Sequence, residues 1–158
     1  MKRFLFLLAL CLPAFADVRL PALIGDHMLL QRDAPLRIWG WADPGEQVSV
    51  TLLGQTSTAT TTPEGKWEVY FTPISAQSTA TTITIKGKNQ ITVQDVLVGE
   101  VWVGSGQSNM QWEVRRSRDA EAEIAAANYP LMRIFRVALK TSETPLDDVE
   151  GKWEVCSP

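Results

Sequence analysis

Apolar and polar residues alternate in short runs from Asp17 to about residue 95. Runs such as Leu36–Trp41, Gln47–Leu52 and Lys66–Phe71 are typical of strands that turn one face toward a core. Turn-forming residues, chiefly glycine, proline, asparagine and aspartate, separate the runs. The pattern predicts an N-terminal all-β sandwich over residues 17–95.

Turn chemistry indicates how some of these strands are connected. Ala42–Glu46 contains Pro44 and Gly45, which favour a tight turn, so the runs on either side are predicted to form a hairpin. A second hairpin is predicted where Gly87–Asn89 separates Thr82–Lys86 from Gln90–Val93. The threonine-rich stretch from Thr56 to Thr62 has strand propensity but little to bury, which favours an edge or outer position.

The pattern changes near Val96. Val96–Val103 is a nearly continuous apolar run, typical of a strand that is buried on both faces of a parallel sheet. A helix is predicted over Asp119–Asn128, with Asp119 as its N-cap, and Leu131–Val137 alternates as a further strand. This order predicts the start of an α/β domain over residues 96–158. A segment of this size cannot enclose such a core, so we expect it to be the incomplete first part.

Residues 1–16 form a predicted signal peptide. Lys2 and Arg3 precede the apolar run Phe4–Leu12, and Pro13–Ala16 ends in a pattern of small residues that suits cleavage before residue 17. The apolar run is far shorter than the ~20 residues that span a bilayer. We therefore expect export to the periplasm or the cell exterior, without a membrane anchor. A lipid attached to Cys11 is the alternative, which the large residue before it disfavours.

Charge and cysteine content exclude several classes of protein. Without residues 1–16 the chain has 13 basic and 18 acidic residues, a net charge of −5, which argues against a nucleic-acid partner. Cys156 is then the sole cysteine, so no internal disulfide framework is expected. A partner cysteine beyond the given sequence and a buried free thiol both remain open.

The loop Gly104–Met110 follows the predicted buried strand, at the edge of the sheet where α/β proteins place their active sites. Ser108 in this loop is a candidate nucleophile, flanked by the hydrogen-bonding amides of Gln107 and Asn109. The loop lacks the third glycine of a dinucleotide fingerprint and the lysine of a phosphate-binding loop. It also departs from a nucleophile elbow at Met110. We predict no cofactor and no metal. On the residues alone, a loop serine is more often a turn residue than a catalyst.

A longer stretch of sequence around Ser108 favours a catalytic role for it. Val98–Trp112 closely resembles the first signature block of the sialate O-acetylesterases, which belong to the SGNH (GDSL-like) hydrolase superfamily. Many relatives carry cysteine or alanine where this chain has Gly104. Further stretches resemble the same family and extend the likeness to almost the whole chain after residue 16: Gly25–Arg32, Trp39–Gly45, Gly65–Trp67, Glu123–Ala127 and Gly151–Pro158.

The resemblance implies a serine esterase that removes acetyl groups from sialic acid or other acetylated glycans. Ser108 would be the nucleophile and its backbone N–H one oxyanion donor, with Gln107, Asn109 and Trp112 lining the site. Two more donors and an Asp-x-x-His pair belong to later blocks of the family, beyond residue 158. The alternatives are an acetyl xylan esterase of the same superfamily and a non-catalytic carbohydrate-binding β-sandwich. The sugar, the acetyl position and the oligomeric state stay open.

His27 is the one histidine of the chain and has to be weighed as a base. Asp26 is its neighbour, but adjacent residues rarely form an orienting pair. The favoured interpretation is a structural histidine that is hydrogen-bonded in a turn.

The tryptophans allow two interpretations. Trp39, Trp41 and Trp67 are expected to pack in the core, although together they could instead form a platform on which a sugar stacks. Trp102 is predicted to lie in the core. Trp112, just after the candidate nucleophile, is the better candidate for lining a pocket.

Overall fold

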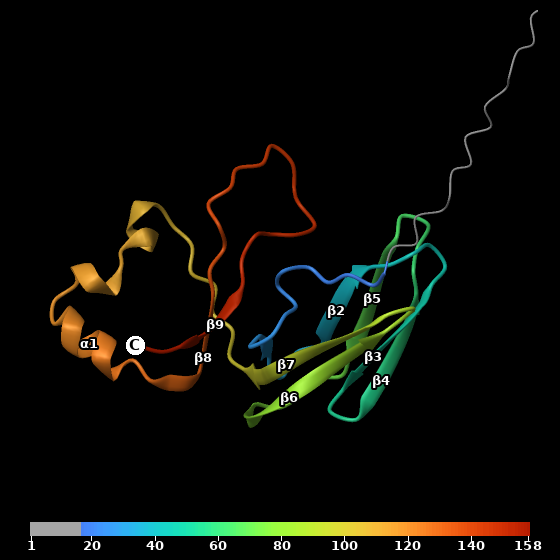
Figure 1. Cartoon of the computed structure of the whole chain (residues 1–158), viewed down its shortest axis with the longest axis horizontal. Helices are drawn as coiled ribbons and strands as arrows, with labels where there is room; N and C mark the ends of the chain where they lie inside the picture. Colours follow the sequence, from blue (N-terminus) through green and yellow to red (C-terminus); the bar gives the residue numbers. More distant parts are fainter. Residues whose placement is uncertain (1–16) are drawn as a thin grey trace, which may run out of the picture.

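A computed structural model describes residues 17–158, so the predicted signal peptide 1–16 lies outside the described residues. The described chain is mostly β-structure (Figure 1). Its elements, in chain order, are β1 (Leu29–Gln31), β2 (Leu36–Trp41), β3 (Gln47–Leu52), β4 (Gln55–Thr60), β5 (Lys66–Phe71), β6 (Gln77–Lys86), β7 (Gln90–Gly99), the 3₁₀ turns η1 (Ser108–Gln111) and η2 (Val114–Arg116), α1 (Ala120–Ala126), β8 (Tyr129–Phe135) and β9 (Trp153–Cys156).

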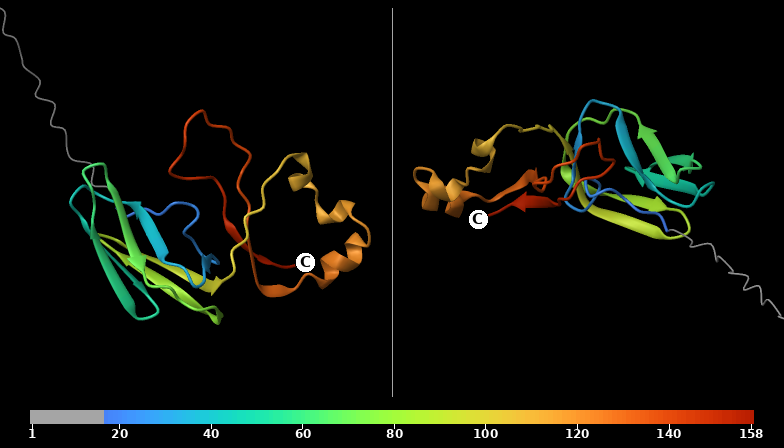
Figure 2. Two further views of the ribbon diagram at one scale, coloured as in Figure 1. Left: turned by 180° about the vertical axis from the view of Figure 1, so that it is seen from behind. Right: turned by 90° about the horizontal axis from the view of Figure 1, so that it is seen from above.

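Two sheets form the N-terminal part. Five strands lie in the order β1-β7-β6-β3-β4, and β2 pairs with β5 in a second, two-stranded antiparallel sheet. The larger sheet curls, and the smaller one covers its concave side (Figures 1 and 2). Both sheets turn fully buried side chains toward a shared core, among them Ile38 from β2, Val50 from β3 and Ile85 from β6. This part of the chain is all-β, as predicted, and its last strand, β7, runs to Gly99, past the predicted boundary at residue 95.

The hairpin predicted around Ala42–Glu46 is wrong. The flanking strands have the predicted bounds, but β2 pairs with β5, whereas β3 pairs with β4 and β6. The turn therefore crosses from one sheet to the other. Gly45 adopts the positive φ of 79° that the turn chemistry indicated. Local turn chemistry is the same for a hairpin and for a crossing between sheets, and only long-range pairing distinguishes them.

Two other pairing predictions are confirmed. β6 and β7 form the antiparallel hairpin expected around Gly87–Asn89, and both strands are longer than predicted. The threonine-rich β4 lies at the edge of the five-stranded sheet. Its side chains are largely exposed, as expected for a strand with little to bury.

The apolar run at Val96–Val103 belongs only in part to a strand. β7 continues to Gly99 and pairs in parallel with β1, so Val96 and Val98 enter the sandwich core while Leu97 is buried on the other face. Burial on both faces was thus predicted correctly. The parallel sheet was not, because β7 is parallel only to β1 and pairs antiparallel with β6 in the larger sheet of the sandwich. Trp102 and Val103 lie beyond the strand and are 88% and 91% exposed, so the prediction of a core Trp102 is wrong.

Residues after Gly99 form a separate, more open layer. The predicted helix is confirmed but shorter, as α1; Asp119 holds the N-cap position with φ of 58° and makes no side-chain capping bond. The predicted second strand is present as β8, which pairs antiparallel with β9. β8 does not pair with β7, so the strand–helix–strand arrangement of an α/β layer is not confirmed. Within residues 17–158, no helix is both long and apolar enough to cross a membrane.

We expect Gly40→Ala to destabilise the sandwich by ~1–3 kcal/mol, because core overpacking at a rigid contact has that cost. A Cβ at Gly40 would overlap the backbone carbonyl of Arg19 and lie 2.9 Å from Cζ2 of the buried Trp67. Gly25→Ala is the matched control, since its Cβ would meet nothing closer than 3.8 Å. Urea denaturation followed by tryptophan fluorescence compares the two. Equal midpoints for both variants would contradict this account of the packing.

Candidate functional site

The predicted nucleophile lies on an exposed loop. The chain leaves the end of β7 and runs away from the sandwich before it reaches η1 (Figures 1 and 2). Ser108 is the first residue of η1, Gln107 is its N-cap and Trp112 its C-cap. The four predicted site residues, Gln107, Ser108, Asn109 and Trp112, therefore share one exposed turn.

Backbone bonds and close glycine contacts shape this turn. The N–H of Met110 donates to the carbonyl of Gln107 over 2.9 Å, and that of Trp112 to Asn109 over 3.1 Å. The Met110 side chain folds back on two glycines. A Cβ added at Gly104 would lie 3.1 Å from Cε of Met110, and a Cβ added at Gly106 would lie 3.0 Å from Cγ of Met110. Met110 thus packs on the loop from the position where a nucleophile elbow has glycine.

Ser108 is chemically available in this arrangement. Its hydroxyl has no hydrogen-bond partner within residues 17–158. The backbone N–H of the first residue of a helical turn has no partner inside that turn, so it is free to donate to a developing oxyanion. The turn from Gln107 to Trp112 therefore presents a hydroxyl and one backbone N–H donor, but it contains no side chain that could take the serine proton.

His27 is held elsewhere. Its Nδ1 lies 2.6 Å from Oδ2 of Asp95, and Nη2 of Arg133 donates to both oxygens of the same carboxylate, over 2.9 and 3.0 Å. Asp26 does not orient the imidazole, because its carboxylate accepts the backbone N–H of Gln94 over 2.7 Å. His27 is hydrogen-bonded in a turn, as the favoured interpretation expected, and its φ is 67°.

A β-bulge in β7 creates this network. Thr81 faces Val96 and Ile83 faces Val93, so Gln94 and Asp95 together oppose one residue of β6. Asp95 has a φ of 53°, and the bulge turns its side chain out of the regular alternation. The backbone groups that the bulge frees are satisfied by the 26–27 turn, because the His27 N–H donates to the Gln94 carbonyl over 3.0 Å.

Few features of the sequence indicate the roles of Asp95 and Arg133. Asp95 interrupts the apolar alternation of its strand, which is a weak indication of a bulge. Arg133 looks like an ordinary polar position of an alternating strand, yet its side chain is 3% exposed and its Nε has no hydrogen-bond partner among the described residues. A buried guanidinium needs a counter-charge, and Asp95 provides it across 38 residues of sequence.

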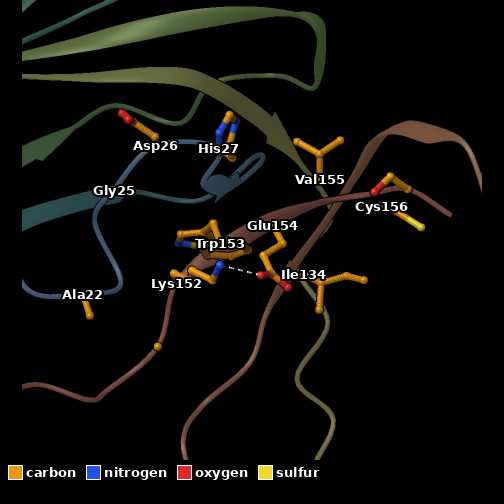
Figure 3. Close-up of a pocket in the computed structure, with 12 residues that line it drawn as sticks. Ala22, Gly25, Asp26, His27, Ile134, Lys152, Trp153, Glu154, Val155 and Cys156 are labelled. Carbon is orange, nitrogen blue, oxygen red and sulfur yellow. Dashed lines mark ion pairs between the residues drawn. The ribbon is translucent and has the colours of Figure 1, made fainter. Parts of the chain in front are cut away.

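One cavity lies at the seam between the sandwich and the β8–β9 pair (Figure 3). It has a volume of about 820 Å³ and includes Asp26 and His27 from one side and Lys152, Trp153 and Glu154 from the other. The Lys152 ammonium lies 2.8 Å from the Glu154 carboxylate, and this hydrogen bond raises the pKa of Lys152 and lowers that of Glu154. Ser108 does not line this cavity.

The three tryptophans of the sandwich divide as follows. Trp67 is in the core, as expected. Trp39 and Trp41 are half-buried in the outward-facing positions of β2, and Trp39 also packs against the core cluster. They line a second cavity of about 670 Å³.

The free thiol and the acidic residues show no sign of a metal centre. Cys156 is a half-buried free thiol that donates weakly to the Ala127 carbonyl at 3.8 Å. In the described part of the chain, no three histidine, cysteine, aspartate or glutamate residues gather as metal ligands would.

Comparison with known proteins places the chain beside esterases, although no protein-family model matches it. It is similar to the sialate O-acetylesterase of Mus musculus, with 37% identity over 147 residues, which cover 83% of this chain and 26% of that protein. The sialate O-acetylesterase of Homo sapiens is 34% identical over 154 residues, covering 85% of this chain and 29% of that protein. These similarities confirm the resemblance that the sequence motifs indicated.

A solved structure agrees with the sequence relatives. A carbohydrate acetylesterase from Xanthomonas citri superposes with a TM-score of 0.85 at 32% identity, covering 89% of this chain and 33% of that one. The chain therefore spans about a quarter to a third of the length of the proteins that it matches.

We expect Asp95→Asn to lower the free energy of unfolding by about 2 kcal/mol or more, because it leaves the buried guanidinium of Arg133 without its counter-charge. Asparagine tolerates the positive φ at this position, so the backbone is preserved. His27→Asn is the matched control: it keeps a residue suited to positive φ and removes only a half-exposed imidazole. Urea denaturation measures both variants, and an equal loss in the two would refute the central place given to the Asp95–Arg133 pair.

Proposed function

We propose that this chain, as a homologue of the sialate O-acetylesterases, carries the catalytic serine, Ser108, of an enzyme that removes O-acetyl groups from glycans. The observation that carries the proposal is the similarity to esterases across the loop that presents Ser108. A match to 83% of 158 residues omits about 27 residues, so it includes residue 108 wherever it begins. That serine is exposed and its hydroxyl is unengaged within residues 17–158.

The proposed reaction is a double displacement. The Oγ of Ser108 attacks the acetyl carbonyl, its proton passes to a base, and the backbone N–H of Ser108 stabilises the oxyanion. The ester C–O bond then breaks, the sugar hydroxyl leaves with the proton, and an acetyl-serine remains. Water attacks this intermediate with help from the same base, which releases acetate and restores the serine.

The base in this proposal is not His27. His27 lies in the turn at residues 26–27, where its Nδ1 pairs with Asp95, and the cavity that it lines does not include Ser108. The relatives are three to four times longer than the stretch they share with this chain. We therefore assign the base to the part of the protein that corresponds to the remaining length of these relatives, in keeping with the resemblance to SGNH hydrolases.

We also assign residues 96–158 to the first part of an SGNH-type α/β layer. Apolar side chains on both faces of β8 support this, because Leu131, Met132 and Ile134 are all about half exposed. A strand of a parallel α/β sheet is apolar on both faces and is normally covered by helices. Trp102 and Val103, which lead to the Ser108 loop, are similarly uncovered.

The proposed substrate is an acetylated sugar. The curated relatives are named for sialate esters, whereas the structural neighbour is named more broadly for carbohydrate esters. An O-acetylated sialic acid is thus the first candidate, and an acetylated plant polysaccharide such as acetyl xylan is the second.

Export by a cleaved signal peptide is part of the proposal, on the pattern of residues 1–16. We expect the exported protein to begin at or near Asp17. Amino-terminal sequencing of the protein from the periplasm or the medium measures this directly. Retention of residues 1–16, or a lipid on Cys11, would be the contrary result.

We expect Ser108→Ala in the native gene product to reduce the deacetylation rate by roughly 10⁴-fold or more, because the covalent route is lost. Ser105→Ala is the matched control: it removes a hydroxyl from the same loop and should retain most activity. His27→Asn should also retain most activity in protein that is folded by circular dichroism. The measurement is the initial rate on an O-acetylated sialoside and on acetylated xylan. Full activity of Ser108→Ala on either substrate would reject the assignment.

A further inference from the structure

We propose that the outer face of the β2–β5 sheet is a second, non-catalytic site that binds a neutral oligosaccharide. The site is the second cavity, of about 670 Å³, within the range typical of small-molecule sites. It shares no residue with the Ser108 turn, so the proposal does not rest on the esterase function.

Strand alternation brings the binding groups to one face. Arg37, Trp39 and Trp41 point outward from β2, while the residues between them enter the core. Lys66 and Glu68 point outward from β5. The register places Trp39 opposite Glu68 and Trp41 opposite Lys66, so each half-buried indole has a charged group directly across the sheet.

The indole rings are held in place by cations. The guanidinium of Arg37 lies 5.0 Å from the centre of the Trp39 ring, and that of Arg19 lies 5.5 Å from the Trp41 ring. Arg37 also donates from Nε to the Glu68 carboxylate over 2.7 Å. The Arg37 and Glu68 side chains remain 52% and 46% exposed, so both keep donors and acceptors that a ligand can reach. Pre-arranged groups of this kind reduce the entropy cost of binding.

Two walls enclose the face. Leu146 and Asp147, from the segment between β8 and β9, approach from one side, and Asp147 accepts a bond from the Lys66 ammonium over 2.8 Å. Thr60 and Thr62, at and after the end of the edge strand β4, lie on another side. The cavity is therefore built from three parts of the chain that are distant in sequence.

The chemistry of the walls selects the class of ligand. A pyranose has an apolar C–H face and a rim of hydroxyl groups, which requires an aromatic surface bordered by donors and acceptors. Trp39 and Trp41 provide the surface, and the paired charges of Arg37 and Glu68 provide the border. Because both basic lining residues are already paired with carboxylates, an anionic ligand gains no unpaired cation. These features favour a neutral sugar chain.

The other cavity does not offer this combination. Its one tryptophan, Trp153, donates its indole N–H to the Leu23 carbonyl over 2.8 Å. The ring of Trp153 also packs at 5.2 Å against Phe135. The Trp153 indole thus contacts both parts of the chain and joins them.

The test measures binding without turnover, in full-chain protein that carries Ser108→Ala. Isothermal titration uses xylohexaose, cellohexaose and mannohexaose as neutral probes, and compares 3′-sialyllactose with lactose. We expect at least one neutral hexasaccharide to bind, and the sialylated probe to bind no better than lactose. Trp39→Ala should weaken that binding roughly tenfold or more, since tryptophan anchors dominate binding sites. Glu68→Gln, which leaves the fold intact, should weaken it several-fold.

Tyr129→Ala, an exposed aromatic residue of β8 outside the cavity, is the matched control and should bind like the parent. If Trp39→Ala does not fold, Trp39→Gln with circular dichroism replaces it. The proposal is overturned if no neutral probe binds at millimolar concentration, if binding survives both the Trp39 and Glu68 changes in folded protein, or if only the sialylated probe binds. Retained binding with Ser108→Ala separates this site from the esterase function, whatever the outcome for catalysis.

Discussion

A buried ion pair joins the two parts of this chain, and the Trp153 indole joins them as well. Arg133 belongs to β8, and Asp95, its counter-charge, belongs to the last strand of the sandwich. A guanidinium that is nearly out of contact with water is stable only with a partner, so β8 has to stay where the carboxylate is. The other bridges between the parts, such as Lys66 with Asp147, are exposed and contribute less. The position of the Ser108 turn depends on this ion pair, because Ser108 lies between Asp95 and Arg133 in the sequence.

The sequence predicted strands better than it predicted sheets. Alternation located β2, β3 and β5 with the observed bounds, because burial of every second side chain is a local consequence of a one-sided core. It could not show that β2 leaves β3 and pairs with β5, since partners are chosen by the whole core. The same limit explains Val96–Val98, where burial on both faces was recognised but the covering sheet was assigned to the wrong layer.

The residues of the two candidate sites could be predicted from the sequence to different extents. Ser108 was found through a long block of similarity, because bare spacing does not distinguish a catalytic serine from a turn serine. Asp95 was missed because its role depends on a bulge and on partners that lie 68 and 38 residues away. Trp39 and Trp41 were found as aromatic residues of a strand. The contact between the Arg19 guanidinium and the Trp41 ring could not be predicted, because it joins residues that are close only in the folded chain.

The pairing of β1 with β7 has a consequence for how the protein folds. The first strand of the sandwich, β1, pairs with the last strand, β7. The backbone N–H of Val18 also donates a hydrogen bond to the side chain of Asn89, 71 residues away. Such a topology has a high contact order, and loop closure over this distance slows folding. A nascent chain therefore cannot complete the sandwich until nearly a hundred residues have left the ribosome. Slow closure of this kind would suit the export that we propose, because a translocon carries the polypeptide unfolded.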